Sequence, residues 1–257
     1  IVGRALDKYS VKNFMMIGAI IYAIGLFSLS FINSYWSLLT IYLTILALGS
    51  IMMGNLAVAK LISNWFDKNA GRALGIAAVG ISFSGVVLPL VVDPLLDLVG
   101  WRNVYVIFAS VVLFIILPLI FFTVIDDPKT VNQVKDGIKK DYEEESLPKE
   151  MTAKDLLSKN GFWIISFAFG VQFLSMMGVL AFLPVHASKM GLDEIWNFLG
   201  IPVKQYVFAY TLSAFGGLLG KIIFGYLMDI MKASYPSMMA MLLQAIGIFG
   251  ITYFNEP

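Results

Sequence analysis

One ammonium group lies inside an apolar stretch of this chain, and it is the strongest candidate for a functional side chain. The stretch, GGLLGKIIFGYLMD, covers residues 216–229 and carries Lys221 eight residues before Asp229. A charge inside an apolar segment is costly to bury, and within a membrane it usually marks a binding site or an ion pathway. Lys221 is therefore a candidate anion-binding group. The alternative is that its long side chain extends to the membrane surface without such a role.

The ending of this stretch, Gly-x-x-x-Asp, occurs twice, and each copy carries a carboxylate that can join two helix ends. Gly225 and Asp229 form one copy, and Gly3 and Asp7 form the other, with Lys8 directly after it. A glycine one turn before the aspartate allows two helices to approach closely. The carboxylate can then pair with a helix N-terminus or with a basic side chain. The predicted gating residues are Gly3, Asp7, Lys8, Arg72, Gly225 and Asp229.

Three further polar side chains in the apolar segments are weaker candidates for lining a substrate cavity. They are Asn55, Gln172 and Tyr210. Hydrogen bonding between helices is the alternative role for polar residues in such segments.

Residues that the sequence lacks exclude several classes of chemistry. The chain has no cysteine and a single histidine, so we expect no thiolate site, no metal centre and no cofactor. It contains no nucleotide-binding glycine loop, which argues against a reaction driven by ATP. We therefore predict a protein that is not an enzyme, has no catalytic residues and binds no nucleic acid.

The composition places these residues in a membrane. Hydrophobic residues make up 59% of the chain, charged residues 14%, and the mean hydropathy is +0.82. Soluble domains are nearer half apolar and a quarter charged, and a chain of 257 residues could not bury this much apolar surface in one core. The lipid bilayer is the predicted partner of the apolar surface.

The apolar segments have the length of membrane-spanning helices. A span needs about 20 mostly apolar residues, and long runs without alternation favour helices over barrel strands. We predict seven spans: 13–32, 36–62, 73–97, 103–125, 162–186, 205–228 and 235–254.

The basic residues between the spans predict the orientation. Thirteen Lys and Arg residues lie on the side that holds the long segment 126–160, and three lie on the other side. The positive-inside rule therefore predicts that residues 126–160 are cytoplasmic. Because both ends of the sequence adjoin helices, we expect a fragment with three parts: 1–125, a mostly solvated tether at 126–160, and 161–257.

The repeated motif resembles that of the major facilitator superfamily. GRALDK (3–8) is similar to the cytoplasmic loop between that family's helices 2 and 3, and GYLMD (225–229) to its counterpart between helices 8 and 9. The resemblance implies an all-α membrane protein, a partial helical bundle with two pseudo-repeated halves, covering the end of helix 2 to helix 9. The family's trailing Gly-Arg-Arg is here reduced to Tyr9-Ser10-Val11-Lys12.

Further motifs resemble the monocarboxylate transporter and oxalate/formate antiporter branch of that family. They are NWFDKNAGRALGIAAVGISFSGVVLPLV (64–91) and GWRNVYVIF (100–108). In this branch a cation four residues before the helix-8 glycine is implicated in holding the substrate carboxylate, and Lys221 falls on that position. Monocarboxylate transporters have a carboxylate four residues earlier, where this chain has Gly217. The resemblance therefore argues against proton symport through this helix, and leaves open anion exchange, facilitated transport, or coupling through the family helices that this sequence does not include.

The resemblance implies a transporter of a small organic anion, of the monocarboxylate, oxalate or formate type, working by alternating access. The transport would be secondary active or facilitative, in a multi-pass protein of the plasma membrane. A seven-helix receptor or sensor without transport activity is the alternative, because seven spans are visible.

Overall fold

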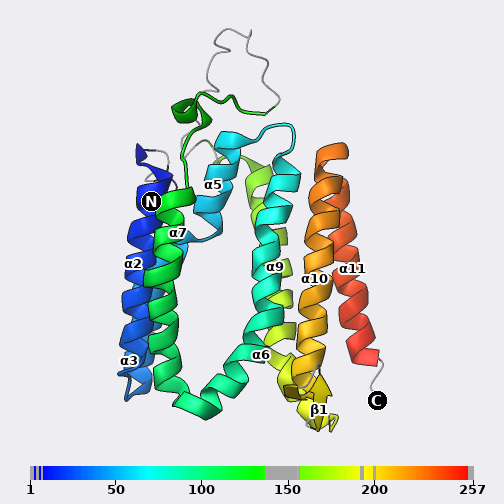
Figure 1. Cartoon of the computed structure of the whole chain (residues 1–257). Helices are drawn as coiled ribbons and strands as arrows, with labels where there is room; N and C mark the ends of the chain where they lie inside the picture. The colour runs from blue at the N-terminus through cyan, green and yellow to red at the C-terminus, as the bar shows by residue number, and fades with distance from the viewer. Residues whose placement is uncertain are drawn as a thin grey trace.

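The structure is a computed structural model. It describes residues 3, 6, 8–136, 155, 157–191, 194–198 and 201–253. In this part of the chain, seven helical segments are long and apolar enough to cross a membrane: Val11–Leu29, Tyr35–Trp65, Ala70–Val92, Pro94–Thr123, Asn160–Leu183, Tyr210–Ile230 and Ser234–Ile251. The prediction of an all-α bundle is confirmed, and Figure 1 shows the helices standing roughly side by side.

The second span is not the single α-helix that the sequence predicted. It consists of α3 (Tyr35–Ile41), a π-helical turn (Tyr42–Leu46), α4 (Ala47–Met53) and α5 (Asn55–Trp65). Gly54 adopts an extended backbone with φ −86° and ψ −156°, which separates α4 from α5. A Cβ atom at this position would collide with the carbonyl oxygen of Ser50, so the break requires glycine.

The third and fourth spans are joined almost without a loop. The helix α6 (Ala70–Val111) contains both the third span and the start of the fourth, and continues through a π-helical turn (Val112–Ile116) into α7 (Leu117–Thr123). The only non-helical residue inside α6 is Gly100, whose φ of 76° lies in the left-handed region that favours glycine. Figure 1 shows the chain reversing direction between the first part of α6 and α7.

The second half begins after the linker. It contains α9 (Asn160–Lys189), a hairpin of β1 (Ile195–Phe198) and β2 (Ile201–Lys204), α10 (Gln205–Ile230) and α11 (Ser234–Tyr253). The strands are antiparallel, with Ile195 opposite Lys204. This hairpin was not predicted from the sequence.

The buried core lies in the first half, where α2 (Val11–Leu29) packs against α4 and α7. Small residues allow these helices to approach, since a Cβ atom on Gly49 would lie 2.6 Å from the backbone nitrogen of Tyr22. Ala19 and Ala23 on α2 are fully buried beside them. Many large apolar side chains on the other faces are exposed, as expected of surfaces that contact lipid.

The start of α6, the end of α10 and residues 126–136 of the linker lie at the same end of the molecule, the upper end in Figure 1. We call this end the linker side. It is the side that the count of basic residues predicts to be cytoplasmic.

Candidate gating and anion-binding site

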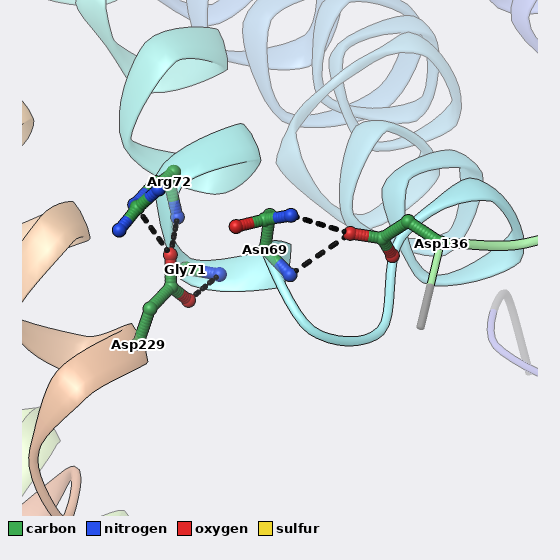
Figure 2. A network of polar contacts seen from close by, with 5 residues as sticks. All are labelled: Asn69, Gly71, Arg72, Asp136 and Asp229. Carbon is green, nitrogen blue, oxygen red and sulfur yellow. Dashed lines mark hydrogen bonds and ion pairs between the residues drawn. The ribbon is translucent and has the colours of Figure 1, made fainter. Parts of the chain in front are cut away.

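Asp229 joins the two halves on the linker side. Its Oδ1 accepts a hydrogen bond of 2.7 Å from the Gly71 N–H, and its Oδ2 accepts one of 2.9 Å from the Arg72 N–H. The Arg72 Nε atom lies 3.4 Å from the same Oδ2 (Figure 2). The Asp229 side chain is only 8% exposed, whereas that of Arg72 is 45% exposed. We call these contacts of Asp229 with Gly71 and Arg72 the linker-side latch.

Asp229 accepts hydrogen bonds from the first N–H groups of α6, which has no capping side chain directly before it. The first N–H groups of a helix lack intrahelical acceptors, and the helix dipole favours a negative charge beside them. Asn69, the residue before α6, makes no side-chain capping bond to it. The carboxylate that caps α6 therefore comes from the end of α10, in the other half of the chain.

Three glycines bring α6 and α10 close enough for this contact. A Cβ atom on Gly75 would lie 2.6 Å from the Lys221 carbonyl oxygen, and one on Gly225 would lie 2.9 Å from the Gly71 carbonyl oxygen. Gly71 and Gly75 are four residues apart and so share one face of α6, the spacing of small residues that favours close helix packing. Backbone therefore packs directly on backbone along this part of the interface.

The same interface holds Lys221. Its Nζ donates a hydrogen bond of 2.8 Å to the Ser82 hydroxyl on α6, and Ser82 is only 7% exposed. A Cβ atom on Gly217, one turn before Lys221, would lie 3.1 Å from the same hydroxyl. An ammonium group has three donors, and Ser82 supplies one neutral acceptor. The lysine thus lies between the two halves rather than at a free helix surface.

A second carboxylate binds the loop that leads into α6. Asp136, in the linker, accepts hydrogen bonds from the Asp67 N–H, from the Asn69 N–H at 3.0 Å and from the Asn69 Nδ2 at 2.9 Å. Figure 2 shows Asp136 and Asp229 on opposite sides of this turn. The hydrogen bond from the Asp67 N–H, with further ones from Asn69 and Lys68, lowers the pKa of the Asp136 carboxyl.

Two of the other predicted gating residues, Gly3 and Lys8, are not part of these contacts between described residues. Gly3 is exposed and has open space around it, and the Lys8 ammonium lies 5.7 Å from the ring centre of Tyr9. Asp7 lies outside the described residues. The gating roles of all six residues stay predictions.

The softer cavity candidates are spread over the fold. Asn55 is exposed at the start of α5, and Tyr210 is half-buried on α10. Gln172 borders a cavity of about 740 Å³ between α9 and α11, and its carbonyl oxygen accepts a hydrogen bond from Gln244. Among the contacts of the described residues, none joins any of these three to Lys221.

Several contacts of the site were missed from the sequence. Ser82 and Gly71 could be found only once α6 and α10 are known to pack antiparallel, because Ser82 then contacts Lys221 and Gly71 contacts Asp229. Asp136 carries no such signal, since it is one of nine acidic residues in 126–160.

Comparison with known proteins gives the family. The family model described as Major Facilitator Superfamily matches residues 1–257. A protein named MFS-type transporter 1, from Ophiocordyceps sp. (strain BCC 1869), is 25% identical over 221 residues, which cover 84% of this chain and 45% of that protein. The fujikurins efflux protein of Gibberella fujikuroi is 32% identical over 101 residues, 39% of this chain and 22% of that protein.

The chain spans about half the length, or less, of these curated relatives. The matched family is one of transporters rather than enzymes, which agrees with the prediction that the protein is not an enzyme. Together with the seven spans it indicates an integral, multi-pass membrane protein. The match covers both halves and the linker, so the chain belongs to the Major Facilitator Superfamily.

Proposed function

We propose that the full-length protein carries a small organic anion, of the monocarboxylate, oxalate or formate type, across the membrane by secondary active or facilitative transport. The observation that carries this proposal is the hydrogen bond between Lys221 and Ser82, which joins two segments that are each apolar enough to cross a membrane, Tyr210–Ile230 and Ala70–Val92. A charge within a membrane-spanning segment is costly, and such charges usually mark a binding site or an ion pathway. Binding of an anionic substrate between two halves that move relative to each other is such a function.

The surroundings of Lys221 support an anion as the substrate. Within the described residues, the ion pairs join Arg72 to Asp229 and Lys135 to Asp67, and no carboxylate pairs with Lys221. Its neighbour Ser82 is neutral, and Gly217 supplies no side chain. The positive charge is therefore available to a substrate carboxylate, and proton coupling through a carboxylate at position 217 is not part of the proposal.

The proposed mechanism is alternating access between residues 1–125 and 161–257, joined by the linker 126–160. In the closed arrangement of the linker side, Asp229 caps α6 and the glycines hold α6 and α10 together. Opening would break both contacts. We propose the plasma membrane as the location of the protein. We propose a cytoplasmic linker, since the basic residues favour the cytoplasm for that side.

A second candidate is efflux of a different compound. It is favoured by the name of one relative, the fujikurins efflux protein, over the 101 residues that match. Both candidates use the same mechanism of two halves that move relative to each other. They differ in the substrate and in the direction of net movement.

Replacing the lysine tests the proposal. In proteoliposomes with the full-length protein, Lys221→Ala is expected to raise the half-saturation concentration of a transported carboxylate by roughly tenfold or more. This is the loss expected of a hydrogen bond to a charged group, about 1.5–3 kcal/mol. Counterflow of labelled formate, oxalate, lactate and pyruvate is the measurement.

Two further variants complete this test. Lys221→Arg keeps the charge and is expected to retain most of the affinity, and Lys232→Ala removes an exposed lysine beyond the end of α10 as a control. Unchanged uptake and unchanged affinity in Lys221→Ala would contradict the anion-binding role. Counterflow of none of the carboxylates would favour the efflux candidate.

A further inference from the structure

We propose that Asp136 is a positioning residue of the gate: by holding the loop 66–69, it orients the N–H groups of α6 that Asp229 binds. The linker is then not only a tether between the halves but also a part of the closing contact. This inference rests on the proposed function, because it acts through the linker-side latch.

The first part of the linker is fixed to the first half at several points. Residues 125 and 126 accept hydrogen bonds through their carbonyl oxygens from the Trp65 Nε1 at 2.8 Å and from the Asn64 Nδ2 at 2.9 Å. The Asp126 carboxylate accepts another of 2.7 Å from the Lys12 N–H at the start of α2. This segment therefore crosses the linker-side ends of α2 and α5 before it reaches Asp136.

Asp136 then holds the turn between α5 and α6 from both ends. Its own N–H donates to the Trp65 carbonyl oxygen at 3.2 Å, where α5 ends. Its carboxylate accepts from the Asp67 and Asn69 N–H groups, just before α6 begins. One residue of the linker thus sets the path of the chain between the two helices.

The side chain of Asn69 connects this turn to the latch. Asparagine before a helix commonly caps the first turn with its side-chain oxygen, but Asn69 makes no such bond to α6. Its Nδ2 instead donates to Asp136. Asp229 is consequently the carboxylate acceptor for the Gly71 and Arg72 N–H groups, two and three residues further on.

The charges around the turn are consistent with an ionised Asp136. The Lys135 ammonium lies 3.7 Å from the Asp67 carboxylate, so the negative charge of Asp67, beside Asp136, is balanced by a cation. Because hydrogen bonds from the turn lower the pKa of Asp136, its contacts persist above the ordinary carboxyl value of 3.8 and are lost only as the pH falls further. Neutralisation by mutation is therefore a better test than acidification.

The test measures how often the linker side is open. Spin labels are attached to cysteines at Ser63 and Lys232, two exposed positions on the linker side of the two halves, in the full-length protein. Distances are measured by double electron–electron resonance. Asp136→Asn is expected to raise the ratio of open to closed populations by roughly three- to tenfold, as expected when exposed hydrogen bonds are weakened. Asp136→Glu, which keeps the charge, is expected to restore part of the closed population.

Asp127→Asn is the matched control. Asp127 lies in the same segment, but among the described residues its carboxylate accepts a hydrogen bond only locally, from the Lys129 N–H. It is expected to leave the distances unchanged. In the double variant Asp136→Asn/Asp229→Asn, the effects are expected to be less than multiplicative, because both residues act on one helix start.

The outcomes separate the positioning role of Asp136 from the latch, while the counterflow measurement with Lys221→Ala tests the proposed transport independently. Shifts in both Asp136→Asn and Asp229→Asn support the positioning role, with the control unchanged and the double variant not multiplicative. A shift in Asp229→Asn alone, a shift in the Asp127→Asn control or fully multiplicative effects would overturn the positioning role and leave the latch in place. No shift in Asp229→Asn would overturn the latch itself, and the positioning role with it.

Discussion

The variant Gly225→Ala is expected to separate α6 from α10 and to leave the linker side mostly open. The added methyl group would lie 2.9 Å from the Gly71 carbonyl oxygen and 3.0 Å from the Gly75 Cα atom. Both are backbone atoms, so no side chain can rotate away and the helices must move apart. Overpacking of this kind costs about 1–3 kcal/mol, which corresponds to a change of roughly 5- to 150-fold in the ratio of closed to open states.

Gly220→Ala is the matched control on the same helix. A Cβ atom there meets nothing within 4 Å, while the gain in helix propensity, about 1 kcal/mol, is the same for both variants. Labelling of a cysteine at Ser82 from the linker side is the measurement. Equal labelling in Gly225→Ala, in Gly220→Ala and in the parent would contradict the close packing as a requirement for closure.

The second large effect is expected of Asp229→Asn. The buried carboxylate accepts from two backbone N–H groups of α6, and hydrogen bonds to charged groups contribute about 1.5–3 kcal/mol each. Because water replaces part of this in the open state, we expect a net loss of about 3 kcal/mol. This would lower the ratio of closed to open states on the order of a hundredfold, with slower counterflow and a smaller change in substrate affinity.

Arg72→Gln provides the comparison. The guanidinium is 45% exposed and 3.4 Å from the Asp229 oxygen, and ion pairs of this exposure contribute little. Its contact with the Tyr226 ring, at 4.6 Å, adds a modest cation–π attraction. We expect an effect several times smaller than that of Asp229→Asn. If the two variants were equal, the ion pair rather than the helix cap would hold the latch.

The spans could be predicted from the sequence because membrane insertion depends on length and composition. The seven predicted segments and the described ones overlap throughout. The interruptions inside them were not predictable in the same way. Gly54 breaks a helix and Gly80 does not, although both are glycines in apolar surroundings. The difference depends on the tertiary packing, which composition does not report.

The candidate site was predictable where one residue type stands out against its surroundings. Lys221 is a charge in an apolar run, and Asp229 closes a repeated motif. Their partners are a serine hydroxyl and two backbone N–H groups, which are groups that occur in many helices and do not stand out in a sequence. Such partners are identified only by the register of α6 against α10. The contacts of Asp136 are identified only by the path that the chain follows after α7.

The turn at Gly100 has a mechanical consequence for the first half. From Ala70 to Gly100, helix α6 is roughly 45 Å long at 1.5 Å per residue, and Gly100 is the single non-helical residue before the helix continues toward α7. If this part of α6 tilted by about 10° around its contact with Asp229, its far end would be displaced by roughly 8 Å by the same geometry. Since no slack loop absorbs that displacement, the neighbouring span would be carried along, and a small tilt at the linker side would become a wide excursion at the opposite membrane surface.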